Sequence, residues 1–278
     1  MHLSTKLSTI FLVLTLYLSP TTASADSIKV MWLGHSTTKI TSVEGKVIVI
    51  DPFLKKNPKT PAIYRDLEAI GKVDLILATH GHGDHIRDIG ELAKLTGATV
   101  LGPWGLIRNL GALGVIDASK SIAMNKGGAV EPLGRGVKIH MVPAEHSSEL
   151  LLPPLGLYDP DLKGPTDIEG GDAVGYVIEL EDGFKIYHSG DTDVFGDMAL
   201  INEFHSPDLA LVCIGGFFTM GPERAAYAVR ELIKPKKVIP IHYGTYPVIN
   251  RSPAEFIEFL GQTSIEVLEA SPGQELEF

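Results

Sequence analysis

One stretch, ATHGHGDHIRD at residues 78–88, constrains this chain more than any other part of its sequence. Its eleven positions hold three of the ten histidines of the chain, together with two aspartates. The stretch begins where VDLILAT, an apolar run typical of a buried strand, comes to its end. Imidazoles and carboxylates at this density suit neither a core strand nor a helix. We therefore expect them to gather at a strand end and to bind a ligand.

The spacing within this stretch indicates a metal site. His80 and His82 alternate, so in extended backbone their side chains point to the same side. The glycine after each of them lets the chain turn tightly. Asp84 and His85 then fall at the start of a following helix. Imidazole and carboxylate are ligands of divalent transition metals, and this spacing favours such a site over a histidine-rich surface turn.

One stretch cannot complete two metal sites, so further ligands have to come from other strand ends. Three later apolar runs are each followed by a side chain of ligand type: His146 in VPAEHSSE, Asp191 in IYHSGDTD and His242 in VIPIHYGTYP. Taken alone, each is more typical of a cap or a turn. Taken with residues 78–88, they predict a single pocket.

The order of apolar runs predicts the fold class. Strands are expected at residues 28–33, 46–51, 73–79, 98–102, 136–142, 173–180, 184–190, 208–214 and 237–242. Helices are expected at 84–97, 221–235 and 252–262, the last with Ser252 as N-cap and Glu255 as the acid that reaches back to it. Strands precede helices in both halves, which indicates an α/β (α+β) protein built as a four-layer αββα sandwich.

The first 25 residues are typical of a cleaved signal peptide. Lys6 gives a positive start, residues 7–18 are apolar, and Ala-Ser-Ala at 23–25 suits a signal peptidase. A membrane-spanning helix needs about 20 apolar residues, so no stable anchor is expected after cleavage. The prediction is an exported protein, periplasmic or secreted, with one domain over residues 26–278; an uncleaved anchor is the alternative.

Charge and cysteine content narrow the classes of partner. The chain has 24 Lys and Arg against 34 Asp and Glu, a formal net charge of −10. Phosphate binding depends on clusters of Lys and Arg, so no nucleic-acid partner is expected. Cys213 is the only cysteine and lies in an apolar run, so the protein is expected to fold without a disulfide.

These residues together resemble a known family. The motif HGHGDH at residues 80–85, followed by His146, Asp191 and His242, resembles that of the metallo-β-lactamase fold hydrolases. The stretches WLGHST, IDPF, YHSGDTDVFGDM, GGFFTMGPERAA and IPIHYGTYP resemble, more narrowly, the uncharacterised metal-dependent hydrolases related to ascorbate-6-phosphate lactonase. The resemblance covers essentially the whole chain after the signal peptide.

The resemblance implies the αββα fold and a set of metal ligands. It places His80, His82 and His146 on a first metal, and Asp84, His85 and His242 on a second, with Asp191 bridging both. Two divalent ions are implied, with zinc as the first expectation and manganese, iron or nickel as alternatives. Antibiotic-degrading members carry a cysteine at the position of Asp191, so a dedicated β-lactamase is not expected.

Such a centre predicts hydrolysis by a metal-activated hydroxide. An ester, lactone, amide or phosphodiester would suit it as substrate. A di-iron redox protein of the same fold is the main alternative, because iron accepts the same ligands. A protein that binds metals without catalysis is a third interpretation, although two ions on seven side chains leave coordination positions open.

Further residues are expected to assist the metals. Asp84 and His35 are the candidate catalytic side chains, with His35 as a hydrogen-bond donor near the metals or as a buried structural histidine. Asp51 is expected to orient a ligand histidine. His188 is expected to be structural or to stand behind the ligands, and Tyr243 either contacts substrate or packs at a strand end.

Two segments are candidates for substrate contact. The turn GGFFTMGP offers Gly215 and Gly216 for close backbone approach and Phe217 as an apolar wall, or else forms a tight turn with a core plug. Residues 147–172 are expected to form a long irregular loop, unusually apolar in LLLPPLGLY. It is either a lid, implying a small-molecule substrate with an apolar portion, or a docking surface for a partner or a membrane, and the lid is preferred because the loop begins directly after His146. A homo-oligomer is left open.

Overall fold

Two β-sheets form the centre of the structure, a computed structural model that describes residues 27–156 and 167–278. Within these residues each sheet has seven strands. The first has the order β16 (Glu275–Glu277), β1 (Lys29–Trp32), β2 (Thr38–Thr41), β3 (Val47–Ile50), β4 (Leu75–Leu77), β5 (Thr99–Pro103) and β6 (Ser121–Met124). The second has the order β15 (Glu266–Val267), β14 (Lys237–Ile241), β13 (Leu209–Cys213), β12 (Lys185–His188), β11 (Val174–Glu179), β8 (Lys138–Pro143) and β7 (Ala129–Val130).

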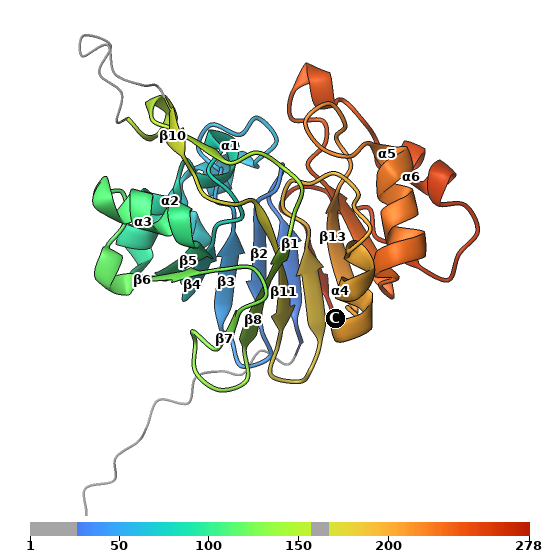
Figure 1. The fold of residues 1–278 in the computed structure, drawn as a ribbon, viewed down its shortest axis with the longest axis horizontal. Helices are drawn as coiled ribbons and strands as arrows, with labels where there is room; N and C mark the ends of the chain where they lie inside the picture. The colour runs from blue at the N-terminus through green and yellow to red at the C-terminus, as the bar shows by residue number, and fades with distance from the viewer. Residues whose placement is uncertain (1–26, 157–166) are drawn as a thin grey trace, which may run out of the picture.

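Helices cover the outer face of each sheet (Figure 1). The first sheet carries α1 (Gly83–Ile86), α2 (Ile89–Thr96) and α3 (Trp104–Ala112). The second carries α4 (Met198–His205), α5 (Pro222–Tyr227), its π-helical continuation η6 (Ala228–Ile233) and α6 (Pro253–Leu260). Short 3₁₀ turns lie at Ala62–Arg65, Leu67–Ile70, Ala118–Lys120, Pro153–Leu155 and Pro247–Ile249. The order of layers is therefore α, β, β, α, which confirms the predicted fold class.

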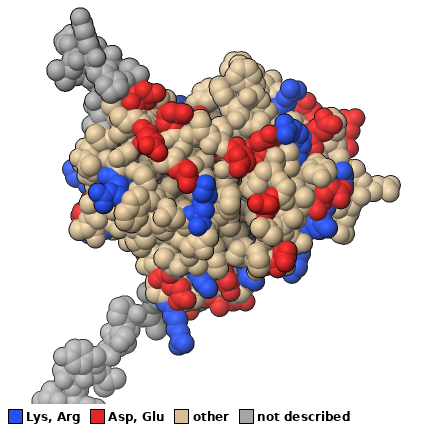
Figure 2. Space-filling model, in the orientation of Figure 1, with Lys and Arg blue, Asp and Glu red and all other residues tan. Residues whose placement is uncertain are grey.

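The visible surface of the molecule carries both signs of charge. Figure 2 shows Lys and Arg scattered among Asp and Glu on this face rather than gathered into one basic patch. None of the described helices is long and apolar enough to cross a membrane. The predicted signal peptide at 1–25 lies outside the described residues.

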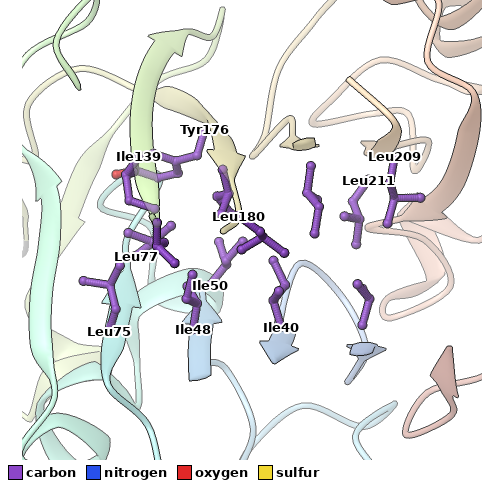
Figure 3. Close-up of a cluster of buried hydrophobic side chains, with 14 of the residues drawn as sticks. Ile40, Ile48, Ile50, Leu75, Leu77, Ile139, Tyr176, Leu180, Leu209 and Leu211 are labelled. Carbon is purple, nitrogen blue, oxygen red and sulfur yellow. The ribbon is translucent and has the colours of Figure 1, made fainter. Parts of the chain in front are cut away.

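The main core lies between the two sheets (Figure 3). Ile48 and Ile50 of the first sheet face it together with Leu209 and Leu211 of the second. The alternate residues of the same strands, such as Val49, face the helices instead. Because these strands are buried on both faces, they read as continuous apolar runs, and burial of each large side chain contributes roughly 1.5–3 kcal/mol.

The directions of the strands bring many strand ends to the same edge. In the first sheet β1 and β2 are antiparallel, β2 and β3 are antiparallel, and β3 and β4 are parallel, so β1, β3 and β4 all run the same way. In the second sheet β8, β12, β13 and β14 share one direction for the same reason. The loops that follow these strands carry the predicted metal ligands.

The helix predicted over residues 84–97 is broken in two. α1 ends at Ile86 and α2 begins at Ile89, with Asp88 between them. The carboxylate of Asp88 accepts hydrogen bonds from the backbone N–H of Leu54 at 2.6 Å and of Lys55 at 3.0 Å. The break therefore anchors the loop after β3. The predicted end at Gly97 is confirmed, with φ of 73° at the C-cap.

The prediction of an irregular loop over residues 147–172 is wrong in part. β9 (Glu149–Leu151) and β10 (Asp167–Glu169) pair as an antiparallel hairpin, which we call the arm. The arm is fixed at its base because Leu150 is fully buried against the helices of the first sheet. Residues 157–166, between the two strands, lie outside the described residues.

The start of α6 provides a test of the sequence-based interpretation. The Ser252 side chain accepts a hydrogen bond from the Glu255 N–H, and the Glu255 side chain accepts one from the Ser252 N–H. We expect Ser252→Ala to lower the free energy of unfolding by about 1 kcal/mol, because one helix N–H loses its partner. Urea denaturation would measure this, with Ser271→Ala, on a surface turn, as a control. Equal stability of the two variants would contradict the capping role.

Candidate metal centre

Three histidines form the first cluster. His80 and His82 follow β4, and His146 follows β8 of the other sheet. His82 Nδ1 lies 3.0 Å from His80 Nε2 and 3.3 Å from His146 Nε2. These three nitrogens converge on one point, within 4.8 Å of one another. His80 is fully buried, and burial lowers its pKa and that of His146, which favours the neutral imidazole that binds metals.

Four side chains form the second cluster: His35, Asp84, His85 and His242. One ligand atom of each lies within 4.8 Å of the others. His35 Nε2 is 3.1 Å from Asp84 Oδ2. Burial opposes ionisation of Asp84, but the hydrogen bond from His35 holds the pKa of this carboxyl below its usual range. His35 thus belongs to the second cluster, whereas the sequence predicted only that it lies near the metals.

Asp191 lies between the two clusters. Its Oδ2 atom is 3.0 Å from His242 Nε2, 3.4 Å from His85 Nε2 and 3.7 Å from His146 Nε2. It also forms a third group with His80 and His85. Burial opposes ionisation of this carboxyl, but His242 and His85 hold its pKa well below the usual range. A carboxylate in reach of both clusters has the position expected of a bridging ligand.

The polar atoms at this centre fit divalent cations. His242 Nδ1 and Asp191 Oδ1 are buried without a hydrogen-bond partner among the described residues, and the contacts of His85 Nε2 and His242 Nε2 with Asp191 Oδ2 lack hydrogen-bond geometry. An unsatisfied buried polar group costs about 1–3 kcal/mol. Several unsatisfied atoms at one point therefore need a common partner. Imidazole nitrogens and carboxylate oxygens are the donors that zinc, manganese, iron and nickel accept.

Two carboxylates surround His85 and affect its titration. Burial would lower the pKa of its imidazole, but the carboxylates of Asp191 and Asp51 raise it well above the usual value. A cation bound at His85 Nε2 would compete with a proton for that nitrogen, so affinity for metal should fall as the pH falls.

Asp51 fixes the orientation of His85. Its carboxylate is 2.8 Å from His85 Nδ1 and accepts hydrogen bonds from the N–H of Thr79 at 2.8 Å and from its hydroxyl at 2.7 Å. With Nδ1 engaged, His85 Nε2 faces the cluster. Asp51 therefore lies where it can orient a ligand, and its effect on the reaction stays a prediction.

Strained backbone conformations concentrate at the centre. His35, Asp51 and His242 have φ of 55°, 48° and 57°, in the left-handed region that residues other than glycine rarely adopt. Each costs of order 1–3 kcal/mol and persists only where its surroundings hold it. The N–H of His242 donates to the carbonyl of His35 at 2.8 Å, so two of these residues hold one another.

Glycines at the centre allow close approach of backbone. A Cβ at Gly81 would lie 3.1 Å from the Glu149 carbonyl oxygen, and one at Gly215 would lie 2.2 Å from that of His242. Gly81 and Gly83 do not have positive φ, so any role of theirs rests on the absence of a side chain. The glycine at 81 instead gives room for the arm.

Sequence reasoning missed Glu149. Its Oε2 atom is 3.1 Å from His82 Nε2, the nitrogen of His82 that faces away from the cluster. The hydrogen bond from His82, with one from Ser147, lowers the pKa of Glu149 to about 2. The arm thus contacts a candidate ligand directly. A carboxylate three residues after His146 was the available signal.

Other predicted site residues lie outside the clusters. Tyr243 stacks on Trp32 in the core at 5.2 Å between ring centroids, whereas Tyr246, which the sequence did not single out, lies 5.7 Å from the ring of His35. His188 Nε2 contacts the carbonyl of Ser36 at 3.0 Å. It links the end of β12 to the loop after β1 and joins none of the three groups.

The GGFFTMGP segment combines the two predicted alternatives, an exposed apolar side chain and a tight turn with a core plug. Gly216 has φ of 67° and forms a tight turn in which its N–H donates to the carbonyl of Met220. Met220 is buried as a core plug, whereas Phe217 is 77% exposed and packs edge-on against Phe218. Cys213 is buried in β13, and burial raises the pKa of its thiol to about 12.

The same fold and sequence pattern occur in other proteins. A family profile described as beta-lactamase superfamily domain matches residues 46–243. A UPF0173 metal-dependent hydrolase of Cupriavidus taiwanensis is 49% identical over 94% of this chain and 90% of its own length. Another, of Thermococcus onnurineus, is 47% identical over 90% of this chain and 99% of its own. The metallo hydrolase Igni18 of Ignicoccus hospitalis superimposes with a TM-score of 0.75 at 32% identity, over 91% of this chain and 98% of its own.

The contact between Glu149 and His82 gives a testable prediction. We expect Glu149→Gln to weaken metal binding by about ten- to 100-fold, because His82 loses the carboxylate that orients it. Titration against a chelating dye would measure the dissociation constant. Glu145→Gln is a matched control, since Glu145 is exposed in the same connection and makes no side-chain hydrogen bond or ion pair among the described residues. Unchanged affinity in the Glu149 variant would show that the contact is incidental.

Proposed function

The chain belongs to the beta-lactamase superfamily and, within it, to the UPF0173 metal-dependent hydrolases, and from this premise we propose that it is an exported hydrolase with two divalent cations in one centre. Membership makes the chain a metal-dependent hydrolase. The number of ions, the export and the class of substrate are the proposal.

The single observation that carries the proposal is the position of Asp191 between two clusters of ligand atoms. The first ion would be held by His80, His82 and His146, the second by Asp84, His85 and His242, and both by Asp191. When bound, two such cations activate water as a nucleophile and polarise a carbonyl or phosphoryl oxygen. Zinc remains the first expectation at the three-histidine position, which suits four-coordinate geometry.

The protein itself shapes the chemistry around the ions. Asp51 holds the orientation of His85, and Glu149 holds that of His82. The two carboxylates of Asp84 and Asp191 balance only part of the charge of two divalent ions. The remaining positive charge favours substrates that gain negative charge in the transition state, such as esters, lactones, amides or phosphodiesters.

The apolar side chains beside the centre support a small-molecule substrate with an apolar portion. Phe217 and Phe218 lie exposed on the turn after β13, and Leu151 lies exposed on the arm. Gly215, at the start of that turn, packs against His242, so the turn is attached to the centre. Such exposed apolar groups beside a polar site are typical of ligand contact.

Export is proposed from the sequence of residues 1–25. The expected mature protein begins at Asp26. Expression of the full chain in a bacterium, followed by fractionation and N-terminal sequencing, tests this. Recovery of intact residues 1–25 on protein in the cytoplasm would contradict export while leaving the hydrolase proposal untouched.

Removal of metal should abolish activity and lower stability. We expect a chelator to lower the melting temperature, because each site at 100 times its dissociation constant contributes about 2.7 kcal/mol. Elemental analysis before and after should give two ions per chain and then none. A fully active, equally stable protein after complete metal removal would contradict the proposal.

A panel of substrates tests the reaction class. We expect the protein loaded with zinc or manganese to hydrolyse at least one of a lactone, an aryl ester, a thioester and a phosphodiester. His146→Ala should abolish this turnover, whereas His205→Ala, outside the clusters, should not. Absence of turnover with two ions bound would count against a hydrolase of these substrates. An iron chromophore with oxygen or peroxide chemistry would support a di-iron redox protein instead.

A further inference from the structure

We propose that His35 is a direct ligand of the second cation, together with Asp84, His85, His242 and the bridging Asp191. This inference rests on the proposed function, because it needs a cation at the second cluster. It assigns to His35 more than the role of a nearby hydrogen-bond donor.

The positions of the nitrogen and oxygen atoms support a shared ion. His35 Nε2 lies 3.1 Å from Asp84 Oδ2, and both atoms lie within 4.8 Å of the ligand atoms of His85 and His242. Two ligand atoms bound to one ion at about 2.1 Å can be at most about 4.2 Å apart. The four atoms therefore need only a small contraction to reach one centre.

The arrangement of the imidazole rings of His35, His242 and His85 also supports a shared ion. The centroids of His35 and His242 are 3.9 Å apart with an interplanar angle of 41°, and those of His35 and His85 are 5.5 Å apart at 62°. Rings at these angles do not stack. These distances place the ring of His35 directly against those of His242 and His85, within the second cluster.

The ring nitrogen of His35 that faces away from the cluster has a hydrogen-bond partner, as is usual for histidines that bind metals. Its Nδ1 atom is 2.9 Å from Thr245 Oγ1. Without a cation, Nε2–H donates to Asp84. With a cation bound, the ring would carry its proton on Nδ1, which would donate to this hydroxyl, and the lone pair of Nε2 would face the ion, just as the contact of Asp51 with Nδ1 directs Nε2 of His85. Thr245 is thus a positioning residue for His35.

The backbone of His35 is held with unusual firmness. Its carbonyl accepts hydrogen bonds from Trp32 Nε1 and from the N–H of His242, each at 2.8 Å. The residue is fully buried and has φ of 55°. A strained, doubly anchored backbone that directs one imidazole into a cluster of unsatisfied atoms indicates function.

The additional ligand makes the two metal positions unequal. The first ion would have three histidines and Asp191, four protein ligands that suit tetrahedral zinc. The second would have five protein ligands, which leaves one position for water in a six-coordinate site. Six-coordinate geometry favours ions such as manganese or iron over zinc. When both positions hold the same metal, the additional protein ligand should make the second ion the last to be lost on chelation.

The test uses the full-length protein loaded with cobalt(II), the wild type against His35→Gln. Glutamine retains a donor for Asp84 but is a poor ligand for these metals. We expect one ion to bind more than about 100-fold more weakly, beyond the ten- to 100-fold typical for loss of an orienting partner. The weak visible absorption of six-coordinate cobalt should be lost, and X-ray absorption should count one imidazole fewer.

Two further variants keep the result interpretable. Thr245→Val should weaken the same ion less than His35→Gln does. His146→Ala should affect the other ion and leave the six-coordinate spectrum in place. Circular dichroism and a melting curve of each metal-free variant establish that it folds.

The outcomes separate this inference from the proposed function. Two ions bound to His35→Gln with wild-type affinity and spectrum would overturn the inference and leave His35 as a hydrogen-bond donor. A wild type that binds a single ion would overturn the dinuclear proposal. The variants would then show whether that ion depends on His35, as inferred, or on His146 alone, which would also overturn the inference.

Discussion

A buried negative charge determines the arrangement of this protein's centre. The carboxylate of Asp191 is almost inaccessible to water and lies 3.0–3.7 Å from nitrogens of His242, His85 and His146. A charge in such a place is stable only where positive charge and hydrogen-bond donors surround it. The nitrogens come from both sheets, so the compensation exists only when the two sheets are packed face to face. Folding of the sandwich and assembly of the metal centre are therefore one process.

The remainder of the structure holds this centre rigid. The apolar core between the sheets fixes the distance between their strand ends, and β1, β3 and β4 point to the same edge as β8, β12 and β14. The loops at that edge contain backbone strain at His35, Asp51 and His242. Such strain is tolerable because the strands beneath are fully buried and the loops hydrogen-bond to one another. The site gains orientation at the expense of local stability, as sites for metals commonly do.

The sequence predicted most of the strands, the four-layer order and the clustering of six of the ligand-type side chains with Asp191. These rest on local signals: apolar runs buried on both faces, and polar side chains directly after them. It did not predict the break at Asp88, because this depends on a hydrogen bond to the distant loop after β3. Nor did it predict the arm, whose short strands pair across residues 152–166. Glu149 was missed because its partner, His82, lies 67 residues away in the chain.

Sequence alone therefore determined which chemical groups this protein places at its strand ends, since residue type and alternation along a strand are local properties. Tertiary structure decided which of those groups meet. His35 enters the second cluster because left-handed backbone turns it inward, and Tyr246 rather than Tyr243 reaches the centre because His242 and Gly244 both adopt positive φ and redirect the chain. Whether two such side chains come within bonding distance depends on the packing of two sheets, and no spacing along the chain encodes that distance.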